Sequence, residues 1–142
     1  MDAREYLETV RAAQRGIDRR LAVIESMQAR EQVRAQRYDA VGKGAHGTDF
    51  MRSTDDRIDY ERRSGAELSE LELGRELCAG VRSANPGKRW GDVLELRYCE
   101  DRTLQEIAGT LGVSVRSVHS DMSSALDWVD MVGIATARSG LG

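Results

Sequence analysis

Apolar side chains in the first thirty residues recur at helical spacing. They are separated by three, four or seven residues, with two glutamines in the same register: Leu7, Val10, Gln14, Ile17, Leu21, Ile24 and Gln28. One face of an amphipathic α-helix has this spacing. The pattern predicts a helix over about residues 3–40, roughly 55 Å long at about 1.5 Å per residue. Because a small globule cannot cover so long a stripe, the helix needs a partner.

A second apolar series begins near Ile58 and ends before Asn85-Pro86-Gly87, where proline and glycine stop a helix. Leu68, Leu71, Cys78 and Val81 share one face of this second predicted helix. Residues 1–85 are therefore expected to form an antiparallel helical hairpin or a dimeric coiled coil. Both arrangements bury the same stripe, so the sequence leaves this choice open.

The segment between these helices, at about 42–56, begins with the polar, glycine-rich run Gly42–Asp49. It has no apolar period and is predicted to be a mobile loop, with His46 in solvent. Lys43 and the glycines suggest a phosphate-binding loop. However, that motif needs four residues between its first Gly and Gly-Lys-Ser/Thr, after a buried strand, and neither condition is met.

Residues 92–132 predict three short helices, separated from the first unit by a linker at 86–91. Asp92 is expected to cap the first helix. Thr103 opens the second as a capping box with Glu106, whose side chain would return to the Thr103 amide. Gly112 supplies a left-handed turn, and Ser114 caps the third helix. Residues 133–142 carry little apolar surface and are expected to fray.

A helix, a short glycine-containing turn and a serine-capped second helix together predict a helix-turn-helix. Ala108 is small where the two helices cross, and Val113 and Val118 fill the wedge between them. The remaining inward positions of the unit are expected to be Leu104, Ile107, Leu111, Met122, Ala125, Leu126 and Val129.

Composition narrows the class of protein further. One proline, 5% aromatic residues and abundant helix-forming residues indicate an all-α fold. No apolar run is long enough to span a membrane, and Met1–Glu5 does not resemble a signal peptide, so we expect a cytoplasmic location. Cys78 and Cys99 lack the spacing of metal ligands and are expected to be buried. No constellation of catalytic residues, metal ligands or cofactor-binding residues is recognisable, so an enzyme is not expected.

The C-terminal unit closely resembles region four of bacterial sigma factors, which binds the −35 promoter element. The resemblance covers about 37 residues and rests on Val93-Leu94-Glu95-Leu96-Arg97-Tyr98, Thr103-Leu104-Gln105-Glu106-Ile107-Ala108, Leu111-Gly112-Val113-Ser114, Val118 and Ala125-Leu126. The order and length of the whole chain are similar to phage-encoded RinA-like or ArpU-like late transcription regulators.

The resemblance implies that residues 115–128 lie in the major groove of double-stranded DNA. By that pattern Val115, Arg116, His119 and Ser120 face the bases, and Thr103, Ser114 and Ser117 face phosphates. Arg116 is the best candidate for a base contact, because its planar fork matches both acceptors of a guanine. Further phosphate contacts are expected from flanking cations: Lys88, Arg89, Arg97, Arg102, Arg62 and Arg63.

Two features depart from the sigma pattern. Asp121 stands where the family has an apolar residue, so either Met122 replaces it through a small helix rotation or Asp121 is exposed. Residues 92–142 contain four basic and eight acidic residues, and the chain as a whole carries a formal charge of -3. Non-specific attraction to phosphates should therefore be weak. Dimerisation through the N-terminal stripe would compensate by doubling the contacts.

The sequence thus predicts a phage-type, sigma-like transcription regulator that binds specific DNA as a homodimer and contacts RNA polymerase. Two alternatives stay open. The chain could be an assembly protein that uses its helix-turn-helix in DNA packaging, as the small subunit of a terminase does. Its acidic third helix could instead bind another protein.

Overall fold

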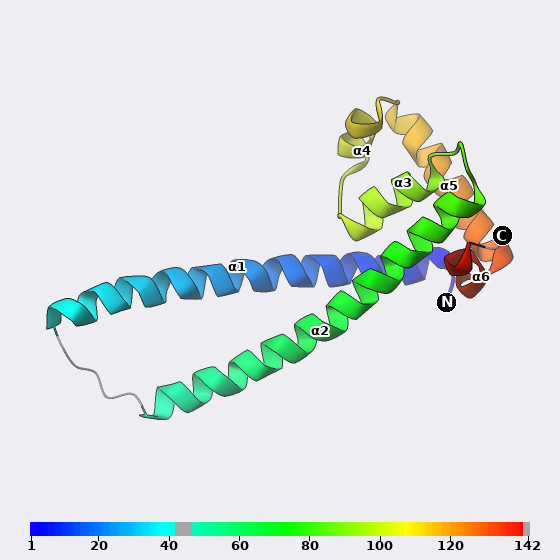
Figure 1. Cartoon of the computed structure of the whole chain (residues 1–142). Coiled ribbons are helices and arrows are strands. Elements are labelled where there is room, and N and C mark those ends of the chain that lie inside the picture. Colours follow the sequence, from blue (N-terminus) through cyan, green and yellow to red (C-terminus); the bar gives the residue numbers. More distant parts are fainter. Residues whose placement is uncertain (42–46, 141–142) are drawn as a thin grey trace.

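The computed structural model describes residues 1–41 and 47–140, with side chains at 1–34, 59 and 61–140. Its regular elements are all helical, which confirms the predicted all-α class. Two long helices, α1 and α2, form a hairpin arm, and the shorter helices gather at one end of it (Figure 1). The elements are α1 (Ala3–Val41), α2 (Gly47–Ala84), α3 (Trp90–Leu94), the π-helix η1 (Glu95–Cys99), α4 (Leu104–Leu111), α5 (Val115–Val132) and α6 (Ile134–Ser139).

The first helix agrees with the periodicity of the sequence, but the second begins earlier than predicted. α2 starts at Gly47 rather than near Ile58, so the expected loop at 42–56 is wrong over 47–56. The remainder of that loop, 42–46, lies outside the described residues. A helix that has already nucleated extends by one backbone hydrogen bond per residue, with no need for an apolar face. The absence of apolar period was therefore a poor guide to where the helix begins.

Two glycines allow α1 and α2 to approach closely near the base of the arm. A Cβ atom on Gly74 of α2 would lie 2.5 Å from a methyl carbon of Val10. A Cβ atom on Gly16 of α1 would lie 2.7 Å from a carboxylate oxygen of Glu67, which forms an ion pair with Arg20. Beyond this point the two helices diverge toward the tip of the arm (Figure 1). Within one chain the hairpin therefore covers only the first half of the α1 stripe.

The base of α2 also holds α6, and this corrects the prediction of a frayed tail. A Cβ atom on Gly80 would overlap the carbonyl oxygen of Ala137 and lie 2.8 Å from that of Arg138, so the backbones of α2 and α6 touch. Arg138 donates to the hydroxyl of Tyr6 at 2.7 Å, which ties α6 to α1 as well. Ala137 is completely buried. Small residues make this contact, and an apolar count of the tail therefore missed it.

The predicted linker at 86–91 is shorter in the structure. α3 begins at Trp90, and Gly91 packs against Cys78 and Arg82 of α2 with no room for a Cβ atom. Asp92 does not cap the helix as expected: it lies in the first turn and accepts a hydrogen bond from Arg82 at 2.9 Å. The arm and the C-terminal unit therefore share one core.

That core joins the arm to every shorter helix. Its largest fully buried side chains come from α1, α2, α3, α4 and α5: Leu7, Val10, Leu77, Val81, Val93, Leu94, Ile107, Val118 and Val129. Cys78 and Cys99 lie in it as predicted, with their Sγ atoms 4.0 Å apart. The hydrogen bond between the two thiols, together with burial, raises the pKa of Cys78 well above its ordinary value. Among the described residues, none of the helices is long and apolar enough to cross a membrane.

Candidate nucleic-acid interface

The turn between α4 and α5 has the geometry that its sequence predicts. Gly112 adopts φ 68° and ψ 34°, the left-handed conformation that glycine tolerates best. The carbonyl oxygen of Ala108 accepts from the amides of both Gly112 and Val113, which closes the end of α4. Ala108 and Val118 are buried at the crossing, and Val113 packs against them from the turn. These contacts fix the angle at which α5 leaves α4.

Hydroxyl groups cap both helices of the pair. The Thr103 hydroxyl accepts from the Glu106 amide at 3.2 Å, and that of Ser114 accepts from the Ser117 amide at 3.1 Å. The Glu106 carboxylate differs from the expected capping box, because it accepts from the Thr103 hydroxyl and from Arg102. Ser114 donates to the Ser117 Oγ at 3.0 Å, which leaves the Ser117 hydroxyl hydrogen available to a phosphate.

The predicted base-facing residues form one exposed surface on the first two turns of α5. Arg116, His119 and Ser120 are exposed, and Val115 beside them is 39% exposed. We call these four residues the DNA-facing patch. Their spacing of three and four residues places Arg116, His119 and Ser120 on the side of α5 away from the buried Val118 and Met122. The side that enters a groove in this class of motif is therefore open to solvent.

Asp121 is drawn away from this patch. Met122 takes the buried position, as one of the two expected alternatives requires, and Asp121 is 19% exposed. Its carboxylate accepts from Arg89 Nε at 2.8 Å. Arg89, expected to bind phosphate, is thus paired in the free protein. Its neighbour Lys88 lies over the ring of Trp90, with Nζ 4.2 Å from the ring centroid.

The other flanking cations divide into near and distant groups. Arg102 lies beside Thr103 and pairs with Glu106 at 3.3 Å, while Arg97 donates to the Arg102 carbonyl oxygen at 3.0 Å. Arg62 and Arg63 lie on α2, nearly twenty residues before the part that contacts α3. That separation is roughly 28 Å along the helix axis. They are therefore remote from the helix-turn-helix that they were expected to flank.

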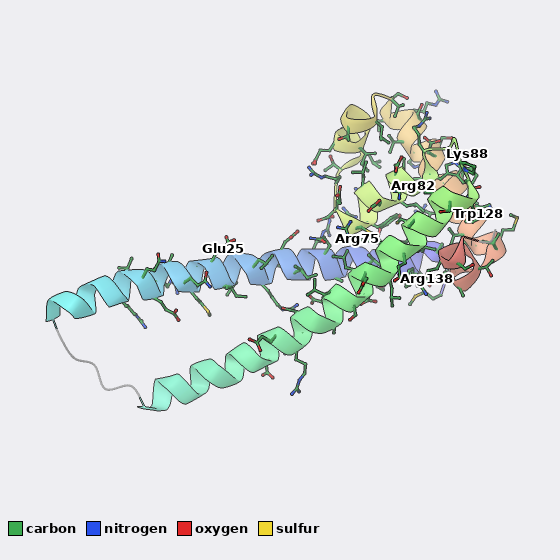
Figure 2. All side chains as sticks on the ribbon, viewed as in Figure 1. Glu25, Arg75, Arg82, Lys88, Trp128 and Arg138 are labelled. Atoms are coloured by element: carbon green, nitrogen blue, oxygen red, sulfur yellow. The ribbon has the colours of Figure 1, made fainter. Side chains whose placement is uncertain are left out.

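Arginines of the arm pair with acidic residues of the C-terminal unit. Arg82 of α2 binds Asp92 and Glu95, and Arg75 reaches the same Glu95 at 3.1 Å (Figure 2). On the other side of the unit, Asp101 accepts from two arginines of α1.

The Asp101 carboxylate lies 2.6 Å from Arg11 Nε and 2.9 Å from Arg15 Nε. Although burial acts in the opposite direction, these hydrogen bonds hold the pKa of Asp101 below its ordinary value. Asp101 also has φ 53°, an unusual conformation for a non-glycine residue. The backbone at the start of α4 is thus anchored to the arm.

Asp130, near the end of α5, accepts from the Ala3 amide at 2.7 Å. A carboxylate is favourable there, because the first amides of α1 lack partners within the helix. Of the eight acidic residues at 92–142, Glu100 and Asp127 are the two outside the ion pairs and hydrogen bonds of the described chain. Most of the negative charge is therefore directed at the arm and the linker, and little of it at the DNA-facing patch.

Sequence reasoning missed this distribution, because each pair joins residues from distant parts of the chain. The departure at Asp121 was visible in the sequence, and so was the cation at Arg89. Their pairing depends on how α3 packs against α5, which no local pattern encodes. Among the described residues, no cluster of three His, Cys, Asp or Glu side chains could hold a metal ion.

This geometry defines a helix-turn-helix unit with an exposed second helix. Residues 89–128 match the protein family Sigma-70, region 4. The match covers α3, η1, α4 and most of α5, so the C-terminal unit is a helix-turn-helix of the sigma-region-four type, and the match supports DNA binding. Comparisons of the chain with curated proteins and with solved structures gave no match.

Proposed function

We propose that the protein is a sequence-specific transcription regulator of phage or prophage type, acting on double-stranded DNA in the cytoplasm. The observation that carries the proposal is the DNA-facing patch. It presents Arg116 on the first turns of α5, free of ion pairs within the described chain, while Asp121 beside it is neutralised by Arg89. No catalytic step is part of this function.

Recognition would work through a division of labour along α5. Arg116 inserts its guanidinium fork between the O6 and N7 acceptors of a guanine. The Ser117 hydroxyl, and the cations Arg102 and Lys88 at the edges of the unit, position the protein on the phosphate backbone. Because Arg116 is the one cation of α5, the specific contact must supply a large part of the affinity.

Weak intrinsic attraction to phosphates favours regulation with partners. We propose that RNA polymerase is one such partner, as the sigma-like unit suggests. A second copy of the chain would be the other. Either partner adds contacts without any change in the DNA-facing patch, so affinity rises through effective concentration.

In vitro transcription tests the regulatory part of this proposal. A template carries the sequence that the protein selects from random DNA, placed near the start site of a promoter used by bacterial RNA polymerase. Occupancy is followed by footprinting, and the transcript is quantified with and without the protein. We expect the transcript level to change as the site fills. An occupied site with an unchanged transcript would contradict regulation and favour a role such as DNA packaging.

A further inference from the structure

Beyond the Arg20–Glu67 pair, the apolar stripe of α1 has no cover within the chain. Leu21 is 52% exposed, Met27 49% and Val33 51%, and Val23 and Ile24 are also exposed. The earlier residues of the same helix, Leu7 and Val10, are completely buried. Contiguous apolar surface of this kind marks an interaction site in a water-exposed protein.

The opposite helix cannot supply the missing cover. The contacts of Val10 with Gly74 and of Gly16 with Glu67 set the antiparallel register of the hairpin. Continued toward the tip, this register would bring Leu21 opposite Arg62 and Ile24 opposite Asp59, both of which are polar and exposed. Burying those charges against leucine and isoleucine would be costly, and the helices diverge instead.

We propose that a second copy of the chain covers this stripe, with the two α1 helices packed antiparallel about a twofold axis. Arg20, Ile24, Met27 and Glu31 follow each other at helical spacing, so they lie along one face with opposite charges at its two ends. Ile24 of one copy then lies against Met27 of the other, and each Glu31 comes opposite the partner's Arg20. An interface of this kind is self-complementary, as a twofold axis requires.

The surface also suits a second copy in charge and length. Between residues 18 and 34, α1 carries four basic and three acidic residues, so two such surfaces barely repel each other. The uncovered part runs for about 20 Å at 1.5 Å per residue, and α2 of each copy can flank it to complete a four-helix bundle. The two helix-turn-helix units would then lie at opposite ends of the dimer. This inference rests on the proposed function only for its consequence, which is that two recognition helices act together.

Sedimentation equilibrium of the full-length chain at tens of micromolar tests the assembly. We expect a dimer, with Ile24→Asp weakening the dimerisation at least tenfold. Ala22→Asp is the matched control, because Ala22 is exposed on the opposite face of the same helix turn, and it should leave the dimer intact. Circular dichroism verifies that both variants keep their helical content. A monomeric wild-type chain, a larger ring, or equal effects of the two substitutions would overturn the proposal.

Cross-linking tests the antiparallel register. The double substitution Ile24→Cys with Met27→Cys should give a disulfide-linked dimer on mild oxidation. Ala22→Cys with Ala29→Cys has the same antiparallel relation on the back of the helix and should not. Equal cross-linking of the two variants would refute the register. A monomeric chain that still selects a DNA sequence overturns the dimer alone, whereas a dimer that selects none overturns the proposed function alone.

Discussion

At the residue scale, the balance between Arg116 and Asp121 decides how α5 meets DNA. Arg116 is exposed and lies outside the ion pairs of the described chain, whereas Asp121 is held by Arg89 at 2.8 Å. A cation that already has a partner loses that pairing when it binds phosphate, and a cation without one does not. The free protein is therefore arranged so that its one specific contact is available.

Replacing Arg116→Ala should weaken binding to the selected DNA site by about 1–3 kcal/mol, because a bidentate contact to guanine is lost. The preference at one base pair should relax while the other positions keep theirs. Fluorescence anisotropy on single-base variants of the site measures both effects. Arg63→Ala is the control, since it removes the same charge far from the helix-turn-helix. An equal loss on every sequence would mean that Arg116 contacts only phosphate.

Asp121→Asn should strengthen binding to random DNA several-fold at low salt, because it frees Arg89 and removes a negative charge beside the DNA-facing patch. The salt dependence of the affinity should become steeper at the same time. Stability should change little, since a partly exposed ion pair contributes about 0–1 kcal/mol. Asp127→Asn removes the same charge without freeing an arginine. If Asp127→Asn gave an equal gain, Arg89 would have no part in DNA binding.

At the scale of the elements, local signals in the sequence were reliable and tertiary contacts were not. Caps at Thr103 and Ser114 and the left-handed Gly112 depend on neighbouring residues, so they could be predicted. α6 could not, because it is held by backbone contact with Gly80. The same holds for η1, where the Glu100 amide bonds to the Glu95 carbonyl five residues earlier, an arrangement with no distinct sequence pattern.

Gly80→Ala should lower the free energy of unfolding by about 1–3 kcal/mol, because the new methyl group meets the backbone of α6. Gly65→Ala in the same helix is the control. Nothing lies within 4 Å of its new Cβ atom, so the better helix propensity of alanine should stabilise the protein by about 0.5–1 kcal/mol. Urea denaturation measures both. A stabilising Gly80→Ala would mean that α6 is not docked there.

Asp101→Asn should destabilise the protein by about 1 kcal/mol at pH 7, with the exposure of Arg15 keeping the loss small. Asparagine keeps the size of the side chain and tolerates the left-handed backbone. Because folding lowers the pKa of Asp101, the stabilisation is present above about pH 4 and is lost as the pH falls through the folded-state pKa. The difference between wild type and variant in urea denaturation should therefore shrink below pH 4. A difference that stayed constant with pH would exclude the charged pair as its cause.

At the scale of the whole molecule, the arm and the sigma-like unit act as one electrostatic system. The net charge of residues 92–142 suggested a poor DNA-binding surface. In the folded chain, Arg11, Arg15, Arg75 and Arg82 of the arm pair with Asp92, Glu95 and Asp101 of the unit. The order of charges along the sequence could not reveal this, because the pairs join residues from 13 to 90 positions apart. Net charge per segment is thus a poor measure of the charge that DNA meets.

The central claim is that the DNA-facing patch recognises a specific sequence, and selection from random double-stranded DNA tests it most directly. The full-length protein is incubated with a random library at low salt, with and without RNA polymerase, and the bound molecules are sequenced over successive rounds. We predict that a short motif is enriched and that Arg116→Ala reduces the enrichment at one position of it. If no motif were enriched under either condition, the account of α5 as a sequence-recognition helix would be contradicted.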